Sequence, residues 1–368
     1  MDRKLASIQK IVNIEPIPDA DNIEKCTVLG WECIIAKKDN FKIGDKIIYI
    51  EVDSIVPDKP EFEFLRQRKF RVRTIKLKKQ ISQGLVLPLS ILPKRKKEYQ
   101  EDEDVTKILE IRKYDPAGDL ENKLALEQVS KRKGKINRFL SRYPWYRRLF
   151  MPSKMRFPKF IEKTDETRIQ KFPNICEKEK DTIFSCTEKL HGQSGTYFLL
   201  KKPKFKILNF KFGKELLFGV CSRKVYLYKQ DNSSYWTIAK QLNIREVLEK
   251  LIVDNEYVVI QGEIIGRGIE ENKYKITGYD FYAFNMVYPD HQLDNPNAKK
   301  LLEEYGIKFV PILDDNFVLR STIPEMVEYA KGKSTLLPVL REGIVVRNYE
   351  RNISFKVINP EFLLKNEE

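Results

Sequence analysis

The chain has 368 residues, which is enough for two domains and a linker. Its composition is 42% hydrophobic and 33% charged, and no stretch approaches the roughly 20 apolar residues of a membrane-spanning helix, so we expect no membrane association. The formal net charge of +15 predicts a polyanionic partner, with a generally basic surface as the alternative.

No apolar segment follows the charged residues 2–4, so we expect no secretory signal peptide. The five cysteines are odd in number and scattered, and they form no CxxC pair or Cys/His cluster. This usage predicts a reducing intracellular compartment, cytoplasmic or other, and argues against a structural zinc site. The oligomeric state is not predicted.

Residues 1–112 have the pattern of an all-β module. A strand pair over 25–35 breaks at Gly30, a turn follows at 41–46, and further strands are predicted at 47–52, 70–77 and 84–89. Several short strands with turn signals indicate a small barrel of the OB type. The alternation in 70–77 predicts outward-facing basic residues, which would follow a phosphate backbone or form a solvated face: Arg71, Arg73, Lys76 and Lys78.

Residues 113–155 are predicted to be a basic linker with short helices. The composition changes from about residue 94: basic runs occur at 94–97 and 131–135, an acidic run at 101–104, and arginines mix with aromatics over 138–150. Such runs either contact nucleic acid or are simply solvated. A nuclear-localisation signal is another interpretation, which nothing else in the chain supports.

Residues 156–368 alternate between strand and helix patterns. Strands are predicted at 182–188, 196–201, 216–221, 257–264, 278–287, 343–347 and 353–358, and helices at 233–251, 296–305 and 323–331. This order favours an α+β core of packed antiparallel sheets with flanking helices.

Lys189 ends an apolar run, and a turn at Gly192 leads into a second apolar run over 196–200. The pattern predicts two strands joined by a loop that presents one amine. Such an amine can attack the α-phosphate of a nucleotide and form a covalent adduct. Because the chain has 68 Lys plus Arg, a surface lysine is the alternative.

Short segments after residue 180 follow in a fixed order, each at a strand or a strand end. They are 189–192, 221–223, 260–263, 280–286, 341–346 and 354–359. This series resembles the covalent nucleotidyltransferase superfamily of RNA ligases, DNA ligases and mRNA capping enzymes.

The resemblance implies roles for several residues. Lys189 is the nucleophile, Lys356 contacts the α-phosphate of ATP, and Glu342 helps to bind Mg²⁺ or Mn²⁺. Glu263 accepts hydrogen bonds from the ribose hydroxyls, and Arg223 lies against the nucleotide and the incoming phosphate. Because Lys189 must be neutral to attack, we expect nearby cations or a metal to lower its pKa.

The resemblance also implies an aromatic platform for the adenine. Phe284 is the first candidate and Phe281 the second, and for both the alternative is a place in the core. Glu188 and His191 complete the nucleotide-binding set. Many relatives carry aspartate where this chain has His191, and histidine there is typical of the nick-sealing branch of RNA ligases.

The N-terminal region resembles an OB module that precedes the ligase core in one clade of RNA ligases. The matching segments are 4–8, 16–21, 49–54, 61–65 and 80–85, followed by 157–158 and 163–170. The resemblance implies that the partner is a nicked duplex with RNA on the 3′-OH strand. Deleting residues 1–112 is then expected to reduce sealing more than lysine adenylylation.

Two features depart from the family pattern. Ile358 stands where a second lysine often follows Lys356, so Lys356 acts alone or Lys365 assists. The lysine-rich segment 201–214 matches no motif, and we expect a hairpin at the edge of the site.

Other functions remain as alternatives. A DNA ligase or a capping enzyme normally places its OB domain after the last lysine motif, and only residues 357–368 follow Lys356. A nucleic-acid-binding protein with an inactive ligase-like core belongs to a different class, although Lys189, Glu263 and Glu342 are all present.

Overall fold

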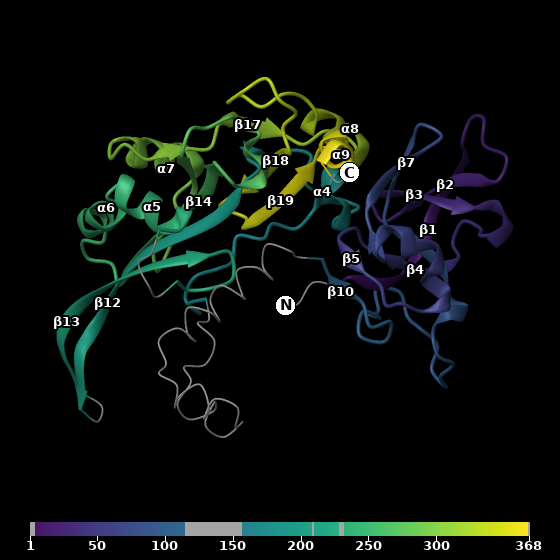
Figure 1. Ribbon diagram of the computed structural model, residues 1–368, viewed down its shortest axis with the longest axis horizontal. Coiled ribbons are helices and arrows are strands. Elements are labelled where there is room, and N and C mark those ends of the chain that lie inside the picture. Colours follow the sequence, from purple (N-terminus) through teal and green to yellow (C-terminus); the bar gives the residue numbers. More distant parts are fainter. Residues whose placement is uncertain (1–3, 115–156, 208–209, 228–231, 367–368) are drawn as a thin grey trace.

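The computed structural model describes residues 4–114, 157–207, 210–227 and 232–366, in which an all-β N-terminal module packs beside a larger core (Figure 1). The core contains both sheets and helices, which confirms the expected α+β class. The remaining residues, including most of the predicted linker over 113–155, lie outside this description.

The main sheet of the N-terminal module is antiparallel and has the order β3-β2-β1-β4-β9. Its strands are β1 (Ala6–Pro16), β2 (Ile23–Val28), β3 (Trp31–Ala36), β4 (Lys46–Ile50) and β9 (Leu85–Pro88). The apolar run in β4 is buried on both faces, because Ile48 and Ile50 enter one hydrophobic cluster while Ile47 and Tyr49 enter another.

Two smaller sheets complete the module. They contain β10 (Arg112–Lys113), β5 (Ser54–Ile55) and β6 (Arg71–Val72) in one, and β7 (Thr74–Leu77) with β8 (Gln80–Gln83) in the other. The single strand expected over 70–77 is therefore wrong, since the chain changes sheets at Arg73. Arg71 turns inward, pairs with Asp53 at 2.9 Å and lies 3.7 Å above the ring of Tyr114.

The core is built from two further sheets. The four-stranded sheet has the order β17-β11-β18-β19 and contains β11 (Ile183–Lys189), β17 (Ile312–Val318), β18 (Gly343–Asn348) and β19 (Ile353–Ile358). The five-stranded sheet has the order β13-β12-β14-β15-β16 and contains β12 (Gln193–Ile207), β13 (Phe210–Ser222), β14 (Tyr257–Gly266), β15 (Tyr279–Val287) and β16 (Lys308–Phe309). All seven strands predicted for the core are confirmed, whereas β16 and β17 were not foreseen.

Helices cover the outer faces of both core sheets (Figure 1). They are α4 (Ile175–Lys178), α5 (Ser234–Gln241), α6 (Ile244–Leu251), α7 (Asn295–Glu303) and α8 (Ile323–Ala330). The C-terminal helix α9 (Pro360–Asn366) instead lies where the core meets the N-terminal module, and it packs against β7. The single helix expected over 233–251 is wrong, because Asn243 adopts a left-handed conformation (φ 46°) and divides it into α5 and α6.

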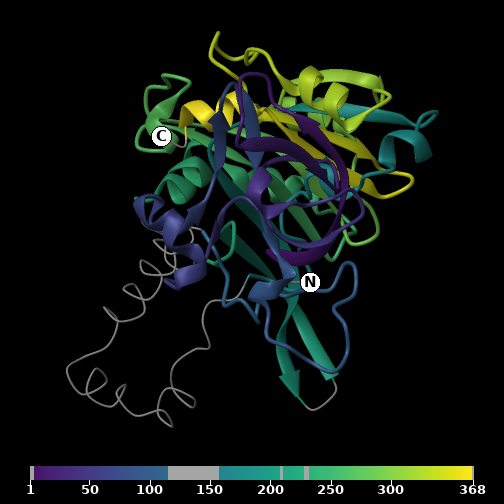
Figure 2. The ribbon, with the colours of Figure 1, turned by 90° about the vertical axis from the view of Figure 1, so that its right-hand side faces the viewer.

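Strands β12 and β13 continue beyond the core as a long ribbon (Figures 1 and 2). Their pairing runs from Gly195↔Ser222 to Ile207↔Phe210. A hairpin over 201–214 is therefore present, but its expected position at the edge of the site is wrong, because it lies at the far end of this ribbon, away from the core (Figure 1).

Candidate active site

A cavity of about 690 Å³ opens between the two core sheets. The four-stranded sheet and its connections place Lys189, Glu342 and Lys356 on one side, because β18 pairs with both β11 and β19. The five-stranded sheet places Glu263 on the other side, together with Arg223 and Phe284. Residues from motifs up to 167 positions apart thus line one space.

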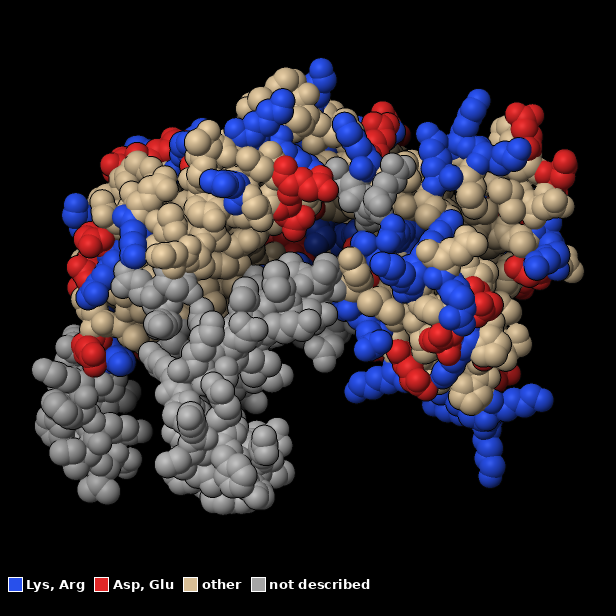
Figure 3. Space-filling view, in the orientation of Figure 1, with Lys and Arg blue, Asp and Glu red and all other residues tan. Residues whose placement is uncertain are grey.

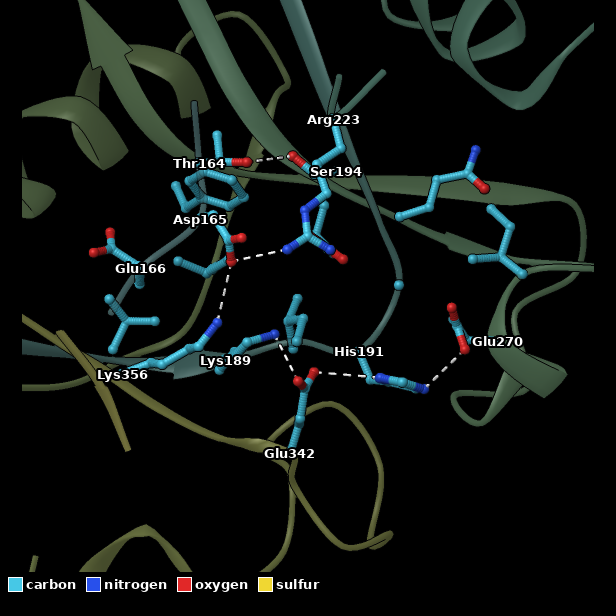
Figure 4. A pocket seen from close by; sticks show the side chains of 18 of the residues that line it. Thr164, Asp165, Glu166, Lys189, His191, Ser194, Arg223, Glu270, Glu342 and Lys356 are labelled. Carbon is cyan, nitrogen blue, oxygen red and sulfur yellow. Dashed lines mark hydrogen bonds and ion pairs between the residues drawn. The ribbon is translucent and has the colours of Figure 1, made fainter. Parts of the chain in front are cut away.

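Lys189 is held by a carboxylate in this cavity (Figure 4). Its Nζ lies 2.8 Å from Oε1 of Glu342. Burial alone would lower the pKa of Lys189, but the negative charges of Glu342 and Glu263 outweigh burial and raise it. The expectation of a lowered pKa is therefore wrong for the free protein, because carboxylates rather than cations are its nearest partners.

His191 fixes the other oxygen of Glu342. Its Nδ1 lies 3.3 Å from Oε2 of Glu342 and its Nε2 lies 3.3 Å from Oε2 of Glu270 (Figure 4). Burial favours neutral imidazole, but the hydrogen bonds to Glu270 and Glu342 raise the pKa of His191 to about 9. Burial also opposes the charge on Glu342, yet Lys189 and His191 hold the pKa of Glu342 well below its usual range.

Asp165 joins two of the expected phosphate-binding cations. Its Oδ1 lies 2.8 Å from Nη2 of Arg223 and 3.3 Å from Nζ of Lys356, while Lys113 approaches Oδ2 at 3.2 Å. Burial lowers the pKa of Lys356 to about 8. Sequence reasoning missed this role of Asp165, since a carboxylate 191 positions from Lys356 has no local pattern that marks it.

Two further carboxylates line the cavity. Burial raises the pKa of Glu263 to about 7. Glu188 is 1% exposed, and its Oε2 accepts hydrogen bonds from the backbone N and the Oγ1 of Thr335, each at 2.9 Å. Its Oε1 is buried without a partner among the described residues.

Of the two aromatic candidates, one lines the cavity and the other is buried in the core. Phe284 lines the cavity, and Arg347 Nη1 donates to its backbone oxygen at 3.0 Å. Phe281 is 1% exposed and instead packs in the core, with its ring edge-on to Tyr197 at a centroid distance of 5.4 Å. Phe284 is therefore the aromatic candidate that a nucleotide can reach.

The N-terminal module reaches the same cavity, which sequence reasoning did not foresee. Asp53 and Tyr114 are among the lining residues. Asp53 Oδ2 lies 3.4 Å from Nη2 of Arg168, a buried guanidinium whose Nε and Nη1 have no partner among the described residues. Of the departures from the family pattern, Ile358 lines the cavity and Lys365 is exposed on α9.

The site provides few protein ligands for a metal. Within the described ranges no group of three or more His, Cys, Asp or Glu side chains is placed to hold a metal ion. Mg²⁺ usually binds one or two protein carboxylates and completes its shell with phosphate oxygens and waters. Glu342, with Glu263 nearby, fits this kind of site.

Among the described helices none is long and apolar enough to cross a membrane.

Comparisons with known proteins agree with this geometry. Residues 182–358 match the RNA ligase family, and residues 5–89 match an OB-fold domain family. No curated protein matches the chain significantly.

Solved structures of a Naegleria gruberi RNA ligase resemble the whole chain. A variant of that enzyme with ATP and manganese is 30% identical, with a TM-score of 0.78 and coverage of 100% of both chains. The same enzyme with pyrophosphate is 30% identical, with a TM-score of 0.76 and coverage of 100% of this chain and 99% of that one. A third structure, an apo variant, is 31% identical, with a TM-score of 0.78 and coverage of 99% and 98%. The protein therefore belongs to the RNA ligase family, with an OB-fold module ahead of its catalytic core.

Proposed function

We propose that this RNA ligase uses ATP and seals 3′-OH/5′-phosphate nicks through a covalent adenylate on Lys189. The observation that carries the proposal is the placement of Lys189 in a cavity that also contains Glu342, Lys356 and Arg223. The related Naegleria gruberi enzyme has been solved with ATP and with AMP, each together with manganese.

In the first step, Lys189 Nζ attacks the α-phosphorus of ATP. The ammonium first gives one proton to solvent; a nitrogen–phosphorus bond then forms, the bond to the bridging oxygen breaks, pyrophosphate leaves, and the nitrogen gives a second proton to solvent. Both burial and Arg223 favour the neutral amine, so the negative charges of Glu342 and Glu263 are what keep Lys189 charged before the reaction. Attack therefore requires Glu342 to release Lys189.

The other lining residues stabilise the bound nucleotide. We assign Lys356 and Arg223 to phosphate oxygens, Glu263 to the ribose hydroxyls and Phe284 to the adenine face. The unpartnered Oε1 of Glu188 is suited to the adenine amino group. A divalent cation held by Glu342 would supply further neutralisation of the phosphate charge.

In the second step, a 5′-phosphate oxygen attacks the phosphorus on Lys189 and the lysine is released. In the third step, the 3′-oxygen attacks the activated 5′-phosphate and AMP leaves. The OB-fold module is assigned to the duplex beside the nick, with RNA on the 3′-OH strand as the proposed partner. Holding the two ends together supplies the proximity that the last step needs.

The first test is label transfer from α-labelled ATP in the presence of Mg²⁺, followed by denaturation. Wild type is expected to retain the label and Lys189→Ala to lose it. Lys180→Ala, an exposed lysine near the other end of β11, is the matched control and should label normally. An unlabelled wild type would instead support a nucleic-acid-binding protein with an inactive core.

The second test is sealing of nicked duplexes with RNA or DNA placed separately on each side of the nick. We expect sealing to depend on RNA at the 3′-OH strand. Equal sealing when that strand is DNA would contradict the proposed partner without affecting the first test.

A further inference from the structure

The hairpin formed by β7 and β8 has residue types in its turn that are unusual for the backbone conformation of the turn. Leu77 pairs with Gln80, so Lys78 and Lys79 form a two-residue turn. Both lysines have positive φ, 48° and 67°. Asn and Gly are the residues that suit such a turn, because side chains with a Cβ are strained in the left-handed region.

The same hairpin concentrates charge that has no partner. Lys76, Lys78 and Lys79 are exposed, and among the described residues none of them pairs with a carboxylate. Leu77 beside them is 39% exposed. Protection of a sheet edge accounts for one lysine on a strand, but it does not account for two lysines in the strained turn. Other non-glycine residues of the described chain also have positive φ, among them Lys69 and Phe70, but in this hairpin the strain coincides with three exposed lysines, and that combination points to a function there.

The hairpin has a defined position relative to the catalytic residues. Gln80, the first residue of β8 after the turn, donates from Nε2 to Oε2 of Glu32 at 3.0 Å. This hydrogen bond holds the turn beside the start of β3. Strand β7 packs against helix α9 of the core. On α9, Phe362 contacts the ring of His191 at a centroid distance of 4.9 Å.

Other cations lie along the same helix. Lys273 lies 4.4 Å from the centroid of the Phe362 ring, and Lys365 is exposed in the last turn of α9. Lys and Arg side chains also gather where the module borders the core (Figure 3). Lysines thus lie on both sides of this border, although Glu270 and Glu271 stand beside Lys273.

We propose that the basic hairpin, residues 74–83, grips the phosphate backbone of the duplex that runs out of the active site. Lys76, Lys78 and Lys79 contact successive phosphates, and Leu77 contacts the sugar edge. This inference rests on the proposed function and adds to it the surface that holds the substrate. Spaced, unpaired lysines fit a repeating polyanion better than a single phosphate group.

The test measures binding of a nicked RNA duplex whose nick carries a 5′-hydroxyl, without ATP, by fluorescence anisotropy over a range of salt concentrations. The variant Lys78→Asn/Lys79→Gly removes two charges and also relieves the turn. We expect binding roughly 10-fold or more weaker near 0.1 M salt, and a salt slope smaller by about 2. The melting temperature should equal or exceed that of wild type.

Two controls separate charge from folding. Lys76→Gln lies outside the turn, and it should weaken binding without changing the melting temperature. Lys37→Gln/Lys38→Gln removes two lysines beyond the opposite end of β3 and should bind like wild type. Affinities of the two hairpin variants within twofold of wild type, with an unchanged salt slope, would overturn the inference. Failure of wild type to form the Lys189 adduct would overturn the proposed function instead.

Discussion

At the scale of single residues, the site is a set of cations held by protein carboxylates. Glu342 holds Lys189, and Asp165 holds Arg223 and Lys356. Under the proposed function, Asp165 occupies a place where phosphate oxygens would bind Arg223 and Lys356, so ATP would have to replace this carboxylate with its own charge. Pairing also relieves the repulsion that several buried cations would otherwise exert on one another.

The two phenylalanines provide a matched pair of variants. Phe281→Leu should lower the free energy of unfolding by about 1–2 kcal/mol, with an ATP KM near that of wild type, because the ring fills the core. Phe284→Leu should raise the ATP KM roughly 3- to 10-fold through lost stacking. Urea unfolding and initial rates of adenylylation measure both effects. A raised KM in Phe281→Leu would contradict the assignment.

Two lysines should set the pH dependence of adenylylation, because one has to be neutral and the other has to be charged. Lys189 must lose a proton and its pKa is raised, so its reactive fraction grows with pH. Lys356 loses its charge above its pKa of about 8; its neighbours are Asp165, Lys189, Arg168 and Arg223. We expect kcat/KM to rise up to about pH 8 and then to level off, because the gain at Lys189 is offset by the loss at Lys356.

The variant Lys356→Met checks that assignment. It should be slower at every pH, but its kcat/KM should continue to rise through pH 8 because the second titration is absent. If the levelling persisted at the same pH, another group would be responsible for it.

At the scale of elements, the motifs take part in the site because they lie at strand ends and on facing sheets. Lys189 ends β11 next to Gly343 of β18, and this pairing brings Glu342 to the amine. Gly262 allows the close approach of β15, since a Cβ there would lie 2.3 Å from Cζ of Phe281. The Phe281 ring therefore packs over Gly262 in the hydrophobic core and does not line the cavity.

The break between α5 and α6 gives an element-scale prediction. Asn243 is exposed and left-handed, so its backbone conformation rather than its packing sets the cost of substitution. Asn243→Gly should change stability by less than about 0.5 kcal/mol, whereas Asn243→Val should cost about 1–2 kcal/mol. Thermal or urea unfolding checks both variants. Equal stabilities of Val and Gly would show that the turn tolerates any residue.

At the scale of the whole molecule, the OB-fold module is docked on the core through a specific contact. Gly30 N donates to the backbone oxygen of Gln170 at 3.1 Å, and Lys171 pairs with Glu51 at 2.7 Å. A Cβ on Gly30 would lie 2.7 Å from Cδ1 of Ile323 and 2.9 Å from Cα of Gln170. The β2–β3 turn therefore approaches the core too closely for any side chain.

This docking predicts the effect of Gly30→Ala. The clash should cost about 1–3 kcal/mol and reduce the cooperativity of unfolding between module and core. Ile323→Val removes the clashing methyl, so the double variant should recover part of the loss. No recovery in a double-mutant cycle would mean that the clash with Gln170 dominates.

The structure also changes the expectation for deletion of residues 1–112. The deletion removes Asp53 and leaves Arg168 at the cavity without its carboxylate. We therefore expect the deletion to reduce lysine adenylylation as well as sealing. The difference between the two losses should be smaller than the sequence predicted. Normal adenylylation by the truncated protein would show that Arg168 does not need Asp53.

The sequence by itself determined the strands of the core and the loop that presents Lys189, because apolar periodicity and turn residues are local signals. The order of the motifs and the role of Lys189 as nucleophile came from the resemblance to the nucleotidyltransferase superfamily. It did not determine the Asp165 bridge or the pKa of Lys189, and it ranked Phe284 above Phe281 only through the family resemblance. Those depend on groups that are far apart in the chain, and only sheet pairing and packing bring them within reach of one another. The contact between Gly30 and the core could not be predicted from the sequence either. It depends on the shapes of two packed surfaces, and neither surface has a local sequence pattern that predicts the contact.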